Sequence, residues 1–333
     1  MDAKIYKRKL PIIPFLIPAF LFMAVFLFWP FLDNIIVSFQ KVKGLATDPK
    51  LWKEGFYEVT RVNNLGKVEH GFLFNTRWYM EMVEEIWDYE KTFETHSFVW
   101  GHGNLLIALK NTGITILATL VCQVGLALIL ALLVSNIKKA AGAFRVVFFF
   151  PIIVSATALA LLFQLIFMFD GGMINQIGHI LGILKEEAKF DWKGTYPIFT
   201  MLTPVIWQYV GFYFVILLTG ISGISEDLYE AASIDGASRI QRVRYITLPL
   251  LKNSISTCAV LAVTGALKVF DLPWVMFPNG ASDTWLTGTY MYSKTMANNV
   301  SYAATISILI VVLGVLLSTI VNKLFKTDES LEM

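Results

Sequence analysis

Long apolar segments alternate with polar segments along most of the chain. An apolar run of about 20 residues with few charges is typical of a helix that crosses a lipid bilayer. Six such runs occur, at about residues 13–36, 112–136, 146–169, 198–223, 254–276 and 302–324. The pattern predicts an all-α, polytopic membrane protein with six transmembrane helices.

The composition agrees with a chain that faces lipid over much of its surface. The 333 residues are 56% hydrophobic and 16% charged, and the mean hydropathy is +0.62. These values are unusual for a soluble globular protein. The net charge of +2 gives no indication of a nucleic-acid partner. The first apolar run is longer than the roughly 7–15 residues of a signal-peptide core, so we expect it to be retained as a helix.

The positions of lysine and arginine predict which helix ends face the cytoplasm. In short loops these residues stay on the cytoplasmic side. They are concentrated at residues 1–10, 137–145, 239–252 and 323–326, and the loops on the opposite side carry fewer. Both termini are therefore expected to be cytoplasmic. Residues 41–105 are expected to form an extracytoplasmic insertion between the first two helices.

The insertion contains one segment with helical periodicity, RWYMEMVEEIWDYEK. The apolar positions that recur at helical spacing are Tyr79, Val83, Ile86 and Trp87. The acidic positions elsewhere on the turn are Glu81, Glu84, Glu85 and Asp88. A helix with a solvated acidic face is the simpler interpretation, and a docking surface for another protein is the alternative.

Neither the histidines nor the cysteines have the spacing of a metal or disulfide site. His70, His96 and His102 follow no regular ligand spacing. Cys122 and Cys258 lie in separate apolar runs and form no CxxC pair. We therefore expect no metal site and no disulfide, and we expect both cysteines to pack among the helices.

A polar segment, residues 225–250, separates the fourth and fifth apolar runs and is predicted to fold as helix, turn and helix. Ser225 can cap the first helix, with Glu226 and Asp227 in its first turn. Gly236 lies where the chain can turn. Pro249 is expected to end or kink the second helix. The pattern by itself is equally consistent with an ordinary cytosolic connector.

The residues of this segment resemble the EAA loop of ABC importer permeases. The matching positions, with the same internal spacing, are Glu230-Ala231-Ala232, Asp235-Gly236-Ala237, Ile246 and Leu248-Pro249. The resemblance implies a cytosolic coupling helix that docks into a cleft of a separate ATPase subunit. The positions to which it assigns that contact are Glu230, Ala231, Ala232, Asp235, Gly236 and Ala237. Val243 departs from the family, in which an aromatic residue is common at this position.

Further segments are similar to sugar-type permeases related to the maltose and glycerol-phosphate importers. They are the first apolar run, ALKNTG before the second, DGGMINQIG after the third and FDLPWVMFPNGASDTWLTGTYMY at the fifth. The resemblance implies that residues 1–333 form one transmembrane domain with the ABC importer permease fold. Residues 41–105 have no clear counterpart in that family.

The resemblance implies the permease subunit of an ABC importer that moves a carbohydrate, an oligosaccharide, into the cytoplasm by alternating access. The chain has no G-x-x-x-x-G-K-[ST] motif, so ATP and Mg are expected on a partner, and no cofactor is expected in this chain. The implied partners are two ATP-binding subunits, a second related permease chain, an extracytoplasmic solute-binding protein and the surrounding lipid. The implied location is the plasma membrane of a bacterium or archaeon.

A few polar residues inside the apolar runs are candidates for the transport pathway. Charged residues are costly inside a bilayer and are often functional there. Lys268 and Asp271 are three residues apart, so they can face each other on one side of a helix. They form either a mutually neutralising pair or part of the pathway lining. Gln164 and Gln208 can bond sugar hydroxyls or link neighbouring helices.

Aromatic rings are also candidates, because they stack on the apolar faces of sugars. The fourth run contains WQYVGFYF, which places aromatic residues on both sides of Gly211. In the maltose-type relatives this helix contributes to the sugar site, so the resemblance favours Tyr209, Phe212 and Tyr213. Helix packing or lipid contact is the alternative for such an aromatic stripe, which includes Trp207.

A secondary transporter of a small polar solute is the main alternative function. It is disfavoured because no inverted repeat is evident and few charges are available inside the membrane for ion coupling. A membrane-embedded enzyme is disfavoured because no cluster of His, Asp or Glu, and no nucleophile with a matching base, suggests catalysis.

Overall fold

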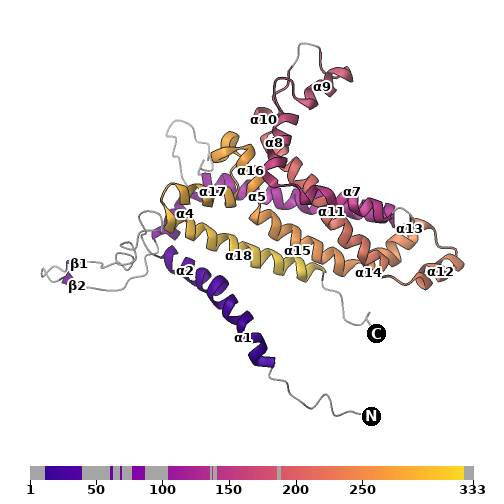
Figure 1. The fold of residues 1–333 in the computed structure, drawn as a ribbon, viewed down its shortest axis with the longest axis horizontal. Coiled ribbons are helices and arrows are strands. Elements are labelled where there is room, and N and C mark those ends of the chain that lie inside the picture. The colour runs from indigo at the N-terminus through magenta and orange to yellow at the C-terminus, as the bar shows by residue number, and fades with distance from the viewer. Residues whose placement is uncertain are drawn as a thin grey trace, which may run out of the picture. The chain divides into compact units, whose positions relative to one another are not determined.

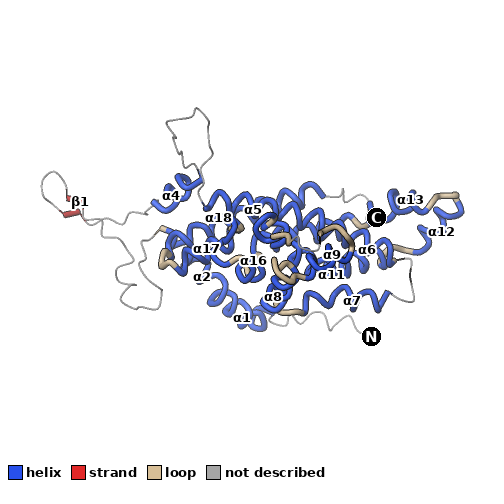
Figure 2. The backbone as a smooth tube through the Cα atoms, turned by 90° about the horizontal axis from the view of Figure 1, so that it is seen from above, coloured by secondary structure: helices blue, strands red, loops and turns tan. Residues whose placement is uncertain are grey.

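The computed structural model describes residues 12–39, 61–62, 68–69, 77–86, 104–135, 137, 141–185 and 189–325. This part of the chain is almost entirely helical (Figure 2). The chain divides into two compact units, one of residues 1–83 with 294–308 and one of residues 84–293 with 309–333. His70, Trp87, Asp88, His96 and His102 lie outside the described residues.

The first unit contains a continuous apolar helix that includes a wide turn. It consists of α1 (Ile12–Met23), the π-helical η2 (Ala24–Phe28) and α2 (Trp29–Ser38). The amide of Asn34 donates to Ser307 Oγ at 2.7 Å, and Ser38 Oγ lies 2.9 Å from the Tyr79 hydroxyl. A short antiparallel ladder joins β1 (Arg61–Val62) to β2 (Val68–Glu69).

The predicted helix of the insertion is present as α4 (Arg77–Ile86), but its acidic face is not uniformly solvated. Glu85 is half-buried, and its Oε1 accepts hydrogen bonds from the Tyr290 hydroxyl and, at 3.4 Å, from the Leu105 amide. Val83, expected on the apolar face, is 51% exposed. These bonds of Glu85 lie within the second unit, and periodicity does not reveal them.

The second unit contains most of the helices. They begin with α5 (Asn104–Ala118), η3 (Thr119–Val124), α6 (Gly125–Val134), α7 (Ala141–Ile153), α8 (Ala156–Ile166), α9 (Met173–Ile180), α10 (Trp192–Thr195) and α11 (Pro197–Ser222). They continue with α12 (Glu226–Ile234), α13 (Arg239–Arg242), η4 (Val243–Thr247), α14 (Leu248–Leu250), α15 (Lys252–Lys268), α16 (Asp271–Met276) and η5 (Pro278–Asp283). Then α17 (Thr287–Met296) and α18 (Val300–Phe325) run from one unit into the other.

The long helix α11 is the centre of the second unit. It lies against α6, α7 and α15, and Figure 1 shows α7 and α15 beside it. One buried apolar cluster joins α6, α11 and α15 and includes Phe214, Leu217 and Cys258. A second joins α8, α11 and α16 and includes Met201 and Phe163. These two clusters fix the position of α11, which carries most of the predicted pathway residues.

Five of the six predicted membrane helices are confirmed, and the sixth run is a bent pair of helices. Five helices of the described chain are long and apolar enough to span a bilayer: Leu16–Ser38, Asn104–Val134, Pro197–Ser222, Lys252–Met276 and Val300–Phe325. The sixth predicted span, about 146–169, is a pair of helices, α7 and α8, bent by 93°. The run expected to form one helix is therefore interrupted between Ile153 and Ala156.

The bend between α7 and α8 coincides with a proline and with a polar contact from α11. Pro151 has no backbone N–H to donate in the last turn of α7. Ser155 then takes an extended conformation, with φ −54° and ψ 133°, and α8 restarts after it. The amide of Gln208 on α11 approaches the carbonyl oxygen of Val154 at 3.5 Å, so a polar side chain faces the broken turn. Breaks of this kind are tolerated inside membranes when a neighbouring helix covers them.

Candidate functional site

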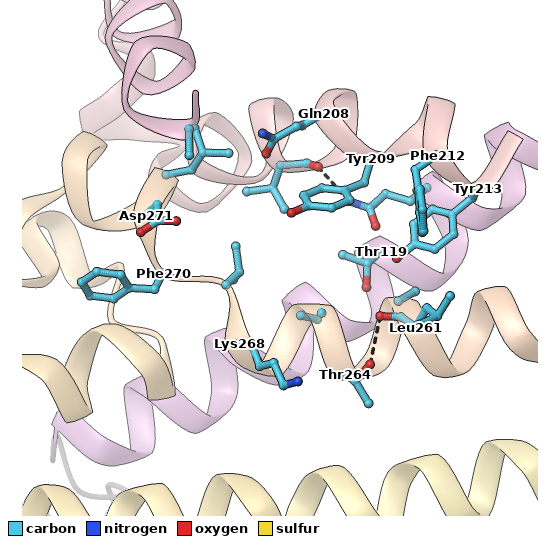
Figure 3. Close-up of a pocket in the computed structure, with 18 residues that line it drawn as sticks. Thr119, Gln208, Tyr209, Phe212, Tyr213, Leu261, Thr264, Lys268, Phe270 and Asp271 are labelled. Atoms are coloured by element: carbon cyan, nitrogen blue, oxygen red, sulfur yellow. Dashed lines mark hydrogen bonds between the residues drawn. The ribbon is translucent and has the colours of Figure 1, made fainter. Parts of the chain in front are cut away.

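A cavity of about 390 Å³ lies among η3, α11 and the α15–α16 junction (Figure 3). Its walls come from segments far apart in the sequence: Thr119 and Gln123 from η3, several residues of α11, and residues 261–272 of the fifth predicted span. The π-helical turn of η3 forms part of the cavity wall, because it carries the polar residues Thr119 and Gln123. Such wide turns are frequent at functional sites.

Six of the seven predicted pathway residues line this one cavity. They are Gln208, Tyr209, Phe212, Tyr213, Lys268 and Asp271. The seventh, Gln164, lies elsewhere: its amide donates to the carbonyl oxygen of Val275 at 2.7 Å and links α8 to α16. Trp207 also points away, packing on Phe163 with ring centroids 5.9 Å apart.

Lys268 and Asp271 do not share one helix side. α15 ends at Lys268, α16 begins at Asp271, and the two residues between them are not helical. Val269 is extended, at φ −61° and ψ 125°. Within the described chain, Lys268 and Asp271 form no ion pair with each other or with another residue, and both are exposed. The neutralising pair is therefore not formed, and both charges remain available at the cavity (Figure 3).

Other polar side chains around the cavity are held by backbone carbonyls. The Gln123 amide donates to the Val205 oxygen at 2.7 Å, and the Thr264 hydroxyl donates to the Val260 oxygen at 2.9 Å. The hydroxyls of Tyr209 and Tyr213 have no hydrogen-bond partner among the residues that the structure describes. The cavity thus combines aromatic rings with two hydroxyls that bond to no described residue and two charged side chains that form no ion pair within the described chain.

Some lining residues were not predicted from the sequence. They are chiefly Thr119, Gln123, Thr264 and Phe270. Gln123 is a polar residue within an apolar run, and that signal was available. Phe270 belongs to a cluster with Trp274 and Tyr292, at centroid distances of 4.8–5.7 Å. Only the break after α15 turns this ring toward the cavity, so sequence spacing does not indicate it.

The polar segment at 225–250 has the predicted helix, turn and helix. The Ser225 hydroxyl accepts from the Asp227 amide at 3.3 Å and caps α12. Gly236 has φ +78°, and the bonds from Gly236 N to Ser233 O (3.1 Å) and from Ala237 N to Ala232 O (2.9 Å) close the end of the helix. The capping box of Ser238 with Gln241 starts α13.

This segment has an exposed apolar rim and is tied to the membrane helices. Ile234 is 87% exposed and Ile240 is 78% exposed, on either side of the Gly236 turn. Of the predicted contact positions, Glu230, Ala231, Asp235 and Gly236 are exposed, and Ala232 and Ala237 are half-buried. The hydroxyls of Tyr229 and Thr247 lie 3.0 Å apart, and Arg242 donates to Ser233 at 2.9 Å. These two bonds hold α12 against the segment that leads into α15.

The described residues offer no metal site. Among them, no group of three His, Cys, Asp or Glu side chains is placed to hold a metal ion. Cys258 is buried and Cys122 is half-buried, and both are free thiols. The cavity and the polar segment are therefore the two features that call for a functional interpretation.

Comparison with known proteins gives a consistent result. Residues 123–328 match the family described as "Binding-protein-dependent transport system inner membrane component". The chain is 31% identical over 230 residues to the probable ABC transporter permease protein YurN of Bacillus subtilis, covering 67% of this chain and 77% of that protein. It is 30% identical over 227 residues to the lactose transport system permease protein LacF of Rhizobium radiobacter, covering 66% and 76%.

The fold is similar to that of a solved bacterial ABC transporter involved in the import of the acidic polysaccharide alginate. The TM-score is 0.70 at 18% identity, and the alignment covers 94% of each chain. A second structure of a bacterial alginate ABC transporter, in complex with an alginate pentasaccharide-bound periplasmic protein, gives a TM-score of 0.69 at 19% identity, over 95% of this chain and 96% of that one.

Proposed function

The chain belongs to the family of binding-protein-dependent transport system inner membrane components, the permease subunits of ABC transporters, and from this premise we propose that it imports a carbohydrate. The observation that carries the proposal is the cavity, in which six of seven pathway residues chosen from the sequence meet. Its tyrosines supply rings for stacking and hydroxyls for orientation, the combination that a sugar site requires.

An oligosaccharide is the proposed substrate class. Relatives named as lactose, arabinooligosaccharide and trehalose/maltose permeases support a carbohydrate. The cavity bears one cationic and one anionic side chain, Lys268 and Asp271, so its formal charge is balanced. Both groups are hydrogen-bonding partners for neutral hydroxyls, and a balanced site does not favour a polyanion. The proposed substrate is therefore a neutral oligosaccharide.

In the proposed mechanism the energy comes from partner chains. Two ATP-binding subunits bind ATP and Mg and close on each other, and their closure moves the segment around Gly236. A second, related permease completes the pathway, and an extracytoplasmic solute-binding protein delivers the sugar. The path then changes from outward-facing to inward-facing. The proposed setting is a bacterial or archaeal plasma membrane with both termini of this chain in the cytoplasm and residues 41–105 outside.

The experiment that tests this function is purification of the tagged chain from its native membrane, followed by reconstitution in lipid. We expect an ATPase, a second permease and a solute-binding protein to co-purify. ATP hydrolysis is then measured with a panel of neutral di- to pentasaccharides and with a uronate oligosaccharide. Stimulation by a neutral sugar supports the proposal. A chain that purifies alone, or a complex stimulated by no carbohydrate, contradicts it.

Gly265 offers a position at which a side chain can be added to the wall of the cavity without a clash at Cβ. A Cβ added there meets no atom within 4 Å. We expect Gly265→Phe to reduce sugar uptake at least tenfold, about 1.4 kcal/mol or more in binding terms, because the ring occupies the substrate volume. The ATPase should still co-purify. Gly113→Phe is the matched control, since Gly113 is also helical, meets no atom within 4 Å and does not line the cavity. Equal uptake by the two variants would contradict the assignment.

The bond between Tyr229 and Thr247 should matter for coupling. Removal of one half-buried hydrogen bond costs about 1 kcal/mol, enough to loosen α12 from the segment that enters the membrane. We expect Tyr229→Phe to retain the ATPase while uptake per ATP hydrolysed falls roughly two- to fivefold. Tyr245→Phe is the control, because Tyr245 is 69% exposed and its hydroxyl has no partner among the described residues. If uptake per ATP hydrolysed is unchanged in Tyr229→Phe, this bond does not contribute to the coupling of ATP hydrolysis to transport.

A further inference from the structure

The helix α9, in the hairpin that joins α8 to α11, has an apolar exposed face. Met173, Ile177 and Ile180 lie at positions i, i+4 and i+7, and all three are exposed. Leu181 and Ile183 continue the same surface just beyond the helix. Ile180 is 83% exposed, an unusual environment for isoleucine in water.

The opposite face of α9 is buried and carries polar Asn175 and small Gly178, together with half-buried Ile174, which packs on the second apolar cluster. Asn175 is 3% exposed. Its amide donates to the carbonyl oxygens of Phe169 (3.0 Å) and Phe190 (3.1 Å), and its Oδ1 accepts from Trp192 Nε1 at 2.9 Å. Gly178 lies against Leu184, where an added Cβ would crowd that side chain. These contacts fix the rotation of α9, so its apolar face is held outward.

The preceding membrane helix, α8, also has an exposed apolar surface. On α8 and the turn after it, Leu162, Leu165 and Phe169 are exposed. In a membrane protein such a surface faces lipid or another membrane helix. α9 has 8 residues and is therefore far shorter than the 20 or so needed to cross a bilayer. A short helix with this surface fits along the membrane rather than through it.

The remainder of the hairpin has the composition of a membrane–water boundary. Trp192, Tyr196 and Phe190 form an aromatic group, with Phe190 to Trp192 centroids 4.7 Å apart. Tryptophan and tyrosine are enriched at this boundary. Lys185 is exposed beside Leu184, and Lys189 pairs with Asp170 at 2.8 Å. Lysines in such positions can reach lipid phosphates while their stems cover apolar surface.

From these observations we propose that α9 is an interfacial helix, with Met173, Ile177 and Ile180 inserted at the boundary between lipid headgroups and acyl chains. In the orientation predicted from the lysines and arginines of the loops, this hairpin lies at the outer leaflet. The role is separate from substrate transport, since α9 contributes no residue to the cavity. It would anchor the hairpin that connects the bent α7–α8 pair to α11.

The test is nitroxide accessibility in the assembled transporter, reconstituted in nanodiscs of phosphatidylcholine and phosphatidylglycerol. Single cysteines replace Ile180 and Met173 in a Cys122→Ala, Cys258→Ala background. Leu165→Cys is the lipid reference, because Leu165 is exposed on the apolar helix α8. Ala297→Cys is the water reference, because Ala297 is exposed in the polar turn between α17 and α18. We expect the labels on α9 to collide with oxygen several-fold more than with a polar nickel chelate, as at Leu165.

Two results would overturn the proposal. A label at Ile180 that favours the nickel chelate, as at Ala297, places this face in water. A label that neither reagent reaches places the face under protein, either the second permease or the solute-binding protein. If the background does not assemble, a photoreactive benzoylphenylalanine at Ile180 in the wild-type chain decides the question. Cross-links to phospholipid support the proposal, and cross-links only to protein contradict it. Each outcome is independent of which sugar is transported.

Discussion

Gly236→Val is expected to separate this permease from its ATPase while leaving the chain folded in the membrane. Gly236 has φ +78°, a conformation that a β-branched residue adopts only with strain. The strain costs about 1–3 kcal/mol, and it falls on the turn between α12 and α13. An added Cβ meets no atom within 4 Å, so the membrane helices are not disturbed.

A cost of about 1–3 kcal/mol corresponds to a change of roughly 5- to 150-fold in an equilibrium constant. We therefore expect the ATPase subunit to bind the variant more weakly by that factor. This binding is measured by titrating detergent-purified ATPase onto the immobilised permease. Gly236→Asn is the matched control, because asparagine tolerates positive φ and should retain most of the binding. If valine and asparagine bind the ATPase equally well, the shape of this turn is not what the ATPase recognises.

Gly211→Ala is expected to destabilise the second unit, in which α11 is the central helix. An added Cβ at this position would overlap the carbonyl oxygen of Phe148 on α7. Backbone atoms cannot move aside as a flexible side chain can, so α7 and α11 must separate. Overpacking of this kind costs about 1–3 kcal/mol, occasionally more. We expect a lower Tm for the purified chain in detergent and less protein recovered from the membrane.

The control for Gly211 is Gly125→Ala. Gly125 is also inside a membrane helix, but a Cβ there meets no atom within 4 Å. Alanine is the better helix former, so this variant should be as stable as the wild type or slightly more so. Equal melting of the two variants would mean that the close approach of α7 to α11 is not needed for stability.

The polar segment and the membrane helices illustrate how much of the fold the sequence predicts. Ser225 as a cap, Gly236 as the turn and the acids of the first turn all follow from local chemistry, and the structure contains each of them. The third apolar run was predicted as one helix because its composition is apolar throughout. Its bend of 93° coincides with Pro151 and with a neighbouring helix that covers the broken turn.

The candidate site, too, was predicted only in part from the sequence. Aromatic and polar residues inside apolar runs identified Gln208, Tyr209 and Asp271, and these line the cavity. The same criterion selected Gln164, which instead links α8 to α16. Composition cannot separate these cases, because a glutamine bonds a carbonyl of a neighbouring helix and a substrate hydroxyl with the same groups.

By itself, therefore, the sequence determined the class of the protein, the number of membrane runs, the helix–turn–helix segment and the family resemblance. These depend on the period of apolar residues and on local backbone chemistry, which act over a few neighbouring positions. Only the tertiary structure decided that η3, α11 and the α15–α16 junction enclose one cavity, that Lys268 and Asp271 do not pair, and that α9 turns its apolar face outward. Each of these depends on contacts between distant segments, and no local pattern specifies which of those segments meet.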